Sequence, residues 1–372
     1  MNYQPDGLLF DETLHSTILH PTAQWMHDWM HTMCVGGVVQ TTLYLLFDAV
    51  AKSGVKFYPM VEGYMKQWNL PKGKSTNIAA IFNNKRAKSN SEAKTFKATA
   101  SELLAFVPIL AYFVQEVVVK AERCVAECKA FLAVADLLEI FQSVSYGYYN
   151  PILIKDKVSQ MQDLFIECNW QQYMHSKFHW LVHMASHLTR FKLLLSCWVH
   201  ERKHRIVKRY AQDVQNTVNY ERSILLQVVS HDLALLQTNE RLFSETAMLQ
   251  KQCKPSKKVM DFVKETWDTE VNTCFMCASA KLAPDGVAHK QDVVILKTSP
   301  PQVCEVWLFA EVNAEVVALV SFWTLVKQDV AFSIWNKVDD PKMIPLEEIK
   351  CSLPFKNLKG NQFVVILPFH CR

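Results

Sequence analysis

Hydrophobic residues recur every three to four positions through most of the first 250 residues, which is the spacing of helices with one buried face. The first such run is predicted to begin near Pro21 and to end at Ser53-Gly54, where turn residues stop the pattern. The polar, lysine-rich stretch from Pro71 to Lys97 is expected to be a solvated connector that contains short helices. Further helices are predicted at residues 101–126, 128–145, 151–167, 177–195, 198–213 and 220–236.

The pattern changes after Gln250. The Lys/Pro/Ser-rich segment Lys251–Lys258 cannot bury much surface, and it is predicted to be a linker. Beyond it, β-branched and aromatic runs predict strands at residues 292–296, 303–312, 316–325, 332–335 and 363–367. The expected fold class is α+β, with a mainly helical region at residues 1–250, a linker at 251–258 and a small β-rich domain at 259–372.

Composition places the chain among globular proteins, because half of its 372 residues are hydrophobic and 20% are charged. Forty Lys and Arg residues against 36 Asp and Glu leave a net charge of +4, so any basic surface must be local. The N-terminus lacks the basic-then-apolar order of a secretory signal. Eleven cysteines without a repeated spacing are therefore expected to be reduced, buried thiols of a cytosolic or nuclear protein.

No membrane partner is expected from the apolar runs. The longest of them, Leu103–Val119, contains Pro108, Gln115 and Glu116, which favours a buried helix over a membrane span.

Two apparent ligand-binding motifs lack essential parts. The string Pro71–Thr76 ends like a phosphate-binding loop, but Trp68 stands where the first glycine of that loop is needed. Cys274 and Cys277 form one CxxC pair without a second pair at zinc-site spacing, which favours two packed thiols over a structural zinc.

Two groups of histidines have helical spacing. Asp28 and His31 are three residues apart, so they can meet on one helix face, either as a capping pair or as part of a metal site. His179, His183 and His187 form a stripe that could bind a metal ion, although such a stripe more often packs against another helix.

A single acid, Glu201, accompanies a strongly basic block on the helix predicted at residues 198–213. A carboxylate in this setting could hold Mg²⁺ while its basic neighbours contact phosphates. The alternative is a solvated helix in which Glu201 pairs with Arg205 one turn later. The basic side chains of this block are Arg202, Lys203, His204, Arg205, Lys208 and Arg209.

The order of these motifs resembles the C-terminal half of CACTA (En/Spm-like) DDE transposases, which have an RNase H-like core. The resemblance covers about residues 1–235, and its spacing is loose between Tyr210 and Asn216. The residues that match the motifs are Asp28, His31, His179, His183, Trp198, Glu201, Arg202, Lys208, Tyr210, Asn216, Glu221, Ser223 and Ile224.

This resemblance implies that Glu201 is the third acid of the DDE triad, whose carboxylates hold two divalent ions about 3.5–4 Å apart at the reacting DNA phosphate. It implies a supporting rather than metal-ligating role for Asp28 and His31. It also implies a nuclear location, whereas without it the chain would be assigned to the cytoplasm.

The sequence departs from the family pattern at the first two catalytic aspartates, which belong on strands upstream of the Asp28 helix. Only 27 residues precede Asp28, and Asp6 and Asp11 lie there in a turn-like polar segment. One carboxylate cannot hold two metal ions, so Mg²⁺ or Mn²⁺ is expected only if a complete active site exists. The RNase H-like core is expected to be largely missing, as in a truncated gene product or a transposase remnant retained for another role.

The expected function is that of a catalytically incomplete, transposase-derived protein that contacts DNA through Lys72–Lys97 and Arg202–Arg209, with little sequence preference. One alternative is a helical protein-interaction scaffold whose basic segments are merely solvated. Another is a fragment of an active, metal-dependent DNA transposase. The sequence gives no indication of the oligomeric state.

Overall fold

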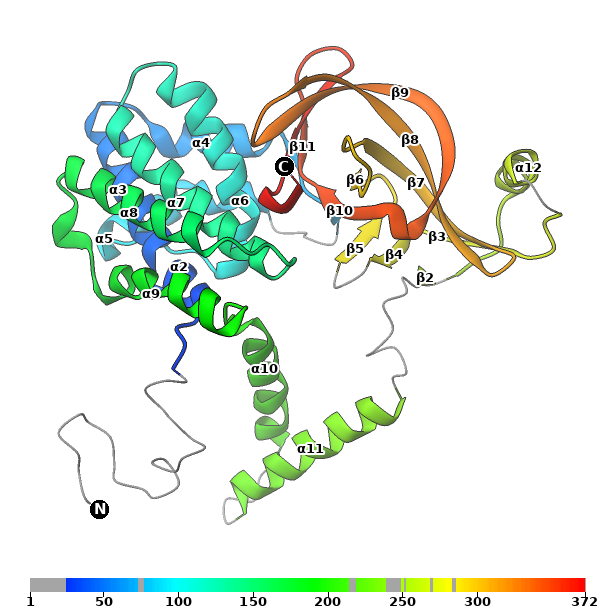
Figure 1. The fold of residues 1–372 in the computed structure, drawn as a ribbon, viewed down its shortest axis with the longest axis horizontal. Coiled ribbons are helices and arrows are strands. Elements are labelled where there is room, and N and C mark those ends of the chain that lie inside the picture. The colour runs from blue at the N-terminus through cyan, green and yellow to red at the C-terminus, as the bar shows by residue number, and fades with distance from the viewer. Residues whose placement is uncertain are drawn as a thin grey trace.

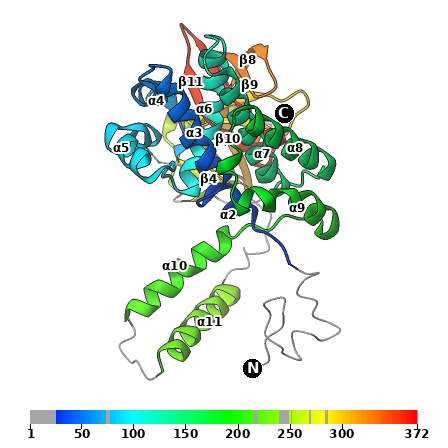
Figure 2. The same cartoon turned by 90° about the vertical axis from the view of Figure 1, so that its left-hand side faces the viewer.

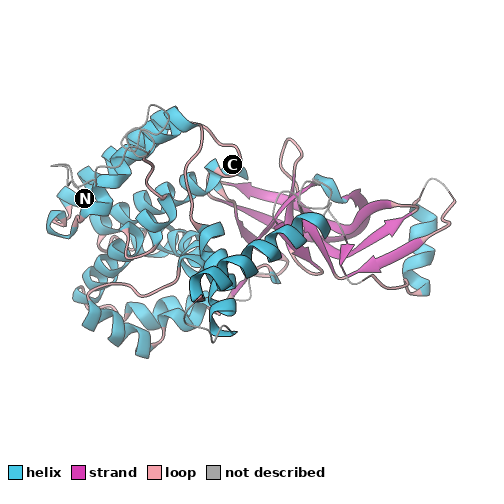
Figure 3. Ribbon diagram, turned by 90° about the horizontal axis from the view of Figure 1, so that it is seen from below, coloured by secondary structure: helices cyan, strands magenta, loops and turns pink. Residues whose placement is uncertain are grey.

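The chain has an α+β fold, as expected, in which helices gather on one side and antiparallel strands on the other (Figures 1 and 3). The computed structural model describes residues 25–72, 77–213, 219–238, 249–250, 252–267, 270–282 and 286–371. The helices are α2 (Trp29–Cys34), α3 (Val38–Lys52), α4 (Phe57–Met65), η2 (Ile78–Phe82), α5 (Asn84–Ala93), α6 (Ala100–Phe113), η3 (Val114–Val119), α7 (Val125–Val144), α8 (Pro151–Glu167), η4 (Gln171–Tyr173), α9 (Ser176–Phe191), α10 (Trp198–Asp213), α11 (Tyr220–Thr238), α12 (Lys257–Thr266), η6 (Leu346–Glu348) and η7 (Phe369–Cys371).

Helices α8 and α10 begin and end at the predicted residues, and α7, α9 and α11 differ from their predictions by a few residues. The long helix predicted at residues 101–126 is shorter. It passes into a π-helical segment at Val114 and ends at Val119, and the left-handed backbone of Cys124 (φ 45°) separates it from α7.

The first predicted helix is divided in two, because α2 ends at Cys34 and α3 begins at Val38. Gly36 has a left-handed backbone (φ 52°), which favours glycine. At Gly37 a Cβ atom would lie 2.3 Å from the carbonyl oxygen of Thr32, so the two segments approach too closely for any side chain there. The predicted start at Pro21 lies outside the described residues.

The stretch from Pro71 to Lys97 contains short helices, as predicted, but the prediction that it is a solvated connector was wrong. It forms η2 and α5, and its residues Phe82 and Phe96 are fully buried. The rings of both residues pack against Phe47 of α3, at centroid distances of 5.8 and 5.5 Å. A few large apolar side chains were enough to fold this polar segment onto the helical core.

The strands form two antiparallel sheets. The larger has the order β1-β11-β12-β9-β8-β7-β6-β10, with β3 paired to β7, and the smaller has the order β2-β4-β5. The strands are β1 (Trp68–Asn69), β2 (Leu249–Gln250), β3 (Cys274–Cys277), β4 (Ser279–Leu282), β5 (Gly286–His289), β6 (Val293–Leu296), β7 (Val303–Val312), β8 (Glu315–Gln328), β9 (Phe332–Pro345), β10 (Ile349–Leu353), β11 (Phe355–Asn357) and β12 (Gln362–Ile366).

Five predicted strands are present as β6, β7, β8, β9 and β12, whereas the other strands and α12 were not predicted. The long strands β8 and β9 curve strongly across the sheet (Figure 1). Register shifts between Ser321 and Trp323, and between Leu325 and Lys327, interrupt their pairing. Such bulges increase the local bend of a strand, which explains the curvature.

The helical and β-rich parts share a strand and a core. β1 comes from the N-terminal part and pairs with β11 of the C-terminal sheet. Phe332, Val364 and Ile366 of that sheet are buried in the same hydrophobic cluster as the helices. Within the predicted linker, Cys253 pairs with Met276, and α12 begins at Lys257.

Two segments are long and apolar enough to cross a membrane by length and composition alone, Trp29–Lys52 and Ala100–Val119. The first contains the break at Gly36-Gly37, and 67% of its most apolar window is buried inside the protein. The second is 44% buried by the same measure. Core helices pass this test as well, so the expected lack of a membrane partner stays a prediction.

Candidate functional site

Asp28 caps the N-terminus of α2. Its Oδ1 accepts a hydrogen bond from the backbone N–H of Met30 (2.8 Å), and its Oδ2 bonds to Nδ1 of His31. A carboxylate at this position satisfies a free N–H group and is stabilised by the helix dipole. Asp28 is therefore the N-cap of α2, and it meets His31 on one helix face as the spacing predicts.

The Asp28 turn lies beside the segment that leads into α10. The backbone N–H of Trp29 donates to the carbonyl of Leu195 (3.0 Å). Ligand atoms of Asp28, His31 and Cys197 all lie within 4.8 Å of one another, and Cys197 immediately precedes α10. The fold thus brings together two motifs that are far apart in the sequence.

The histidine stripe of α9 packs against His27, the residue before Asp28. The ring of His27 stacks on Trp180 at 5.1 Å, and its centroid lies 5.7 Å from His183 and 5.5 Å from His187. Nε2 of His183 and Nε2 of His179 are 3.2 Å apart. Among the described residues, these imidazoles do not form one of the groups of three whose ligand atoms converge. The stripe packs against another segment, which is the alternative to metal binding.

Burial lowers the pKa of His27, and the neighbouring His187, His183 and His179 lower it further. Burial also lowers the pKa of His187, together with His183 and Arg190. A base with a depressed pKa binds its proton more readily in the unfolded chain, so folding stability is lost as the pH falls below about 6.5.

We expect the melting temperature of the wild-type protein to fall between pH 7.5 and pH 5.5, and to fall less in a His27→Phe/His187→Gln variant. Thermal unfolding followed by circular dichroism at both pH values measures the difference. His231→Gln on α11 lies outside this cluster and should retain the wild-type fall. An equal fall in the double variant would show that these imidazoles do not cause the pH dependence.

The basic block with Glu201 lies on α10, as predicted. The side chains of residues 199–205 lie outside the described residues, so the placement of Glu201, Arg202, Lys203, His204 and Arg205 is given by the helix alone. The side chains of Lys208 and Arg209 are exposed. Helices α10 and α11 run outward from the helical part as a pair (Figure 2).

In the second basic segment, Lys72–Lys97, some cationic side chains have partners within the protein and others are exposed. Arg86 donates to the carbonyl of Lys97 (3.1 Å) and lies 3.8 Å from the Glu102 carboxylate. Nζ of Lys72 donates to Gln291 (2.7 Å). Lys85, Lys88, Lys94 and Lys97 are exposed, and Lys74 lies outside the described residues.

Other candidate residues are placed as follows. Cys274 and Cys277 are buried in two different hydrophobic clusters, which confirms the interpretation as packed thiols. Most of the loop that resembles a phosphate-binding motif, residues 73–76, and both Asp6 and Asp11 lie outside the described residues.

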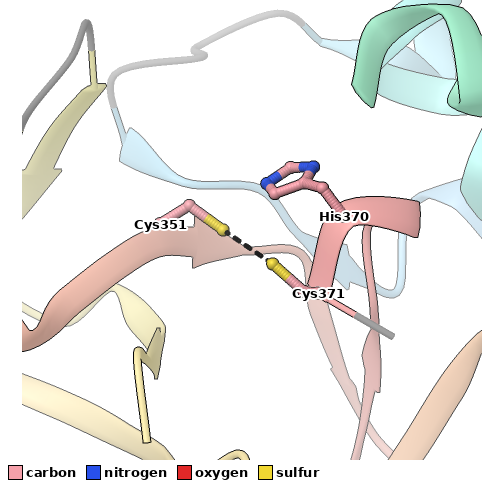
Figure 4. A group of neighbouring side chains, drawn as sticks. All are labelled: Cys351, His370 and Cys371. Atoms are coloured by element: carbon pink, nitrogen blue, oxygen red, sulfur yellow. Dashed lines mark hydrogen bonds between the residues drawn. The ribbon is translucent and has the colours of Figure 1, made fainter. Parts of the chain in front are cut away.

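A second convergent group was missed by the sequence analysis. Sγ of Cys351 on β10 and Sγ of Cys371 on η7 are 3.9 Å apart, and His370 completes a set whose ligand atoms lie within 4.8 Å of one another (Figure 4). The adjacent His370-Cys371 pair was the only signal in the sequence, because Cys351 is 20 residues away. Pairing of the last strands is what brings these residues together.

A cavity of about 90 Å³ adjoins this group, between the helical and β-rich parts. From the C-terminal part it is lined by Cys351, Ser352 and His370, and from the helical part by Glu139 of α7 and by Tyr146 in the turn after α7. The Tyr146 ring stacks on the His370 imidazole at a centroid distance of 4.1 Å and an angle of 10°. The helical part therefore forms one wall of the cavity, and the turn after α7 orients one of the candidate ligands.

Hydrogen bonding with Cys351 lowers the pKa of the Cys371 thiol below its usual range. Burial opposes this shift, while a hydrogen bond with His370 and the positive charges of His370 and Lys350 add to it. The thiolate is the form of cysteine that binds metals and acts as a nucleophile.

Comparison with protein-family models, with curated proteins and with solved structures gives no match to this chain.

Proposed function

We propose that this chain is a transposase-derived protein that binds DNA without cutting it, and that α10 makes the contact. The observation that carries the proposal is the projecting basic helix, with its exposed Lys208 and Arg209. Such a helix offers several cations to phosphates along one side of a duplex, and it needs no deep pocket to do so.

The position of α10 supports the resemblance on which the ancestry rests. The family pattern links an Asp-x-x-His helix, a histidine helix and a basic helix that carries the last acid. In this chain Nζ of Lys177, on the histidine helix α9, donates to the carbonyl of His31 (3.1 Å), and Cys197 joins the start of α10 to the same turn. The three motifs are neighbours in space.

DNA cleavage is not part of this proposal. The resemblance supplies one catalytic acid, Glu201, whereas two-ion catalysis of strand transfer needs several carboxylates around a pair of Mg²⁺ or Mn²⁺ ions. Phosphate contacts alone give binding that depends strongly on salt and little on sequence.

A charge-reversal variant tests the contact. Replacing Arg202, Lys203, Arg205 and Arg209 with glutamate should abolish retention of duplex DNA on a filter at low salt. For the wild-type protein, the logarithm of the binding constant should fall linearly with the logarithm of salt, with a slope of about −0.9 for each phosphate contact.

The matched control carries four charge reversals elsewhere, at the exposed residues Lys56, Lys129, Lys155 and Lys264. It has the same net charge as the test variant and should bind DNA nearly as well as the wild type. Equal retention by the α10 variant and the wild type would remove α10 from the proposal.

A protein-interaction scaffold is the second candidate, because α11 carries an exposed apolar stripe. Leu225, Val229 and Leu233 recur every four residues and are 62%, 44% and 54% exposed. In the same titration, a wild-type protein that shows no salt-dependent retention of DNA would favour this candidate.

A further inference from the structure

The thiols of Cys351 and Cys371 have the separation of two ligands on one metal ion. Thiolates bind Zn²⁺ at about 2.3 Å, so two of them at a tetrahedral angle are about 3.8 Å apart. The observed separation of the sulfur atoms is 3.9 Å, far longer than the roughly 2.05 Å of a disulfide bond. Both side chains point toward each other with the His370 imidazole beside them (Figure 4).

The imidazole has a nitrogen atom available for the same ion. Nε2 of His370 is buried and has no hydrogen-bond partner among the described residues. Burial of such an atom is costly unless another group compensates it, and a bound cation would do so. Stacking on Tyr146 holds the ring, and Nζ of Lys350 donates to the backbone carbonyl of His370.

We propose that Cys351, His370 and Cys371 bind one Zn²⁺ ion. Two thiolates and one imidazole form a donor set typical of zinc, and the softness of the sulfur ligands disfavours Mg²⁺ and Ca²⁺. This site is independent of the DNA contact proposed for α10.

The adjoining cavity supplies the fourth coordination position. Cys351 and His370 line it, and its volume of about 90 Å³ exceeds what one water molecule requires. Three protein ligands and a water molecule are the arrangement of open zinc sites. The ion would also link η7 to β10. It would thereby stabilise the wall of the cavity that the β-rich part contributes.

Zinc content and cobalt spectroscopy on the full chain test this site. After dialysis against Zn²⁺ under reducing conditions, the wild-type protein should retain one ion per chain, and removal of the ion by a chelator should lower its melting temperature by several degrees. With Co²⁺ as the probe, sulfur-to-metal charge-transfer bands and visible bands of tetrahedral intensity are expected.

Cys351→Ser and Cys371→Ser should lose these bands, and His370→Ala should bind at least about tenfold more weakly. Cys253→Ser, which changes an exposed thiol outside the group, should behave as the wild type. Circular dichroism shows whether each variant folds.

Measurements on the wild-type protein alone can test the zinc site. Absence of zinc retention would overturn the proposal. So would a mass two hydrogen atoms lower than expected, with a Cys351–Cys371 disulfide found by peptide mapping of protein kept under reducing conditions. Undiminished cobalt bands in a folded Cys371→Ser variant would also contradict it.

Discussion

Truncation of Phe82 to alanine should lower the free energy of unfolding by about 3–5 kcal/mol, the range for large aromatic side chains removed from a packed core. Phe82 is fully buried although it lies in the lysine-rich stretch between β1 and α6. Its ring centroid is 5.8 Å from those of Phe47 and Phe96 and 5.1 Å from that of Phe106. The loss includes the transfer of the ring out of water and the cavity left between three fixed rings.

Denaturation in urea, followed by circular dichroism, measures this loss for Phe82→Ala. Phe275→Ala is the matched control, because Phe275 on β3 is 38% exposed and should cost less than Phe82. If both variants lost the same small amount, the segment from Pro71 to Lys97 would contribute no core, and its interpretation as a solvated connector would be restored.

Replacing Asp292 with alanine should cost about 3–5 kcal/mol as well, through the loss of a buried charged acceptor. The Asp292 carboxylate is 3% exposed. It accepts hydrogen bonds from the backbone N–H groups of Lys72 (3.0 Å) and His289 (2.9 Å) and from the hydroxyl of Ser352 (3.3 Å). Alanine would leave these donors without their partner, and an unsatisfied buried donor costs more than the hydrogen bond itself contributes.

The same measurement on Asp136→Ala provides the comparison. Asp136 forms an ion pair with Lys157 at 3.0 Å, but its side chain is 45% exposed, and surface pairs contribute at most about 1 kcal/mol. Equal losses in the two variants would show that the buried Asp292 carboxylate contributes no more to stability than a surface ion pair does.

Asp292 also links the two parts of the molecule at the cavity. Lys72 follows β1, and Ser352 lies on β10 next to Cys351 and lines the cavity. Asp292→Ala should therefore disturb the placement of β10 against the helical part in addition to lowering stability.

The helices show where the local sequence pattern is sufficient to predict an element and its bounds. The bounds of α8 could be predicted because Asn150 caps it, Pro151 opens it and its buried residues Ile154, Val158, Met161 and Phe165 have helical spacing. All of these signals lie within one segment of the chain, as do the β-branched and aromatic runs that predicted β7 and β8.

The predictions failed where contacts between segments that are far apart in the sequence determine the structure. The break at Gly37 depends on close approach of the backbone at Thr32, and the burial of Phe96 depends on Phe47 of α3. Strands as short as β1 contain too few residues to show alternation, so only pairing with β11 makes them strands.

The candidate sites divide in the same way into features that local sequence predicts and features that depend on tertiary contacts. The sequence alone determined that a basic helix carrying Glu201 runs from Trp198 to Asp213, because helical periodicity and charge are local properties of the chain. Tertiary structure alone decided that Cys351 meets His370 and Cys371, and that Tyr146, in the turn after α7, stacks on His370. Those contacts arise from the antiparallel pairing of the last strands and from packing across the shared core, and neither leaves a periodic signal in the sequence.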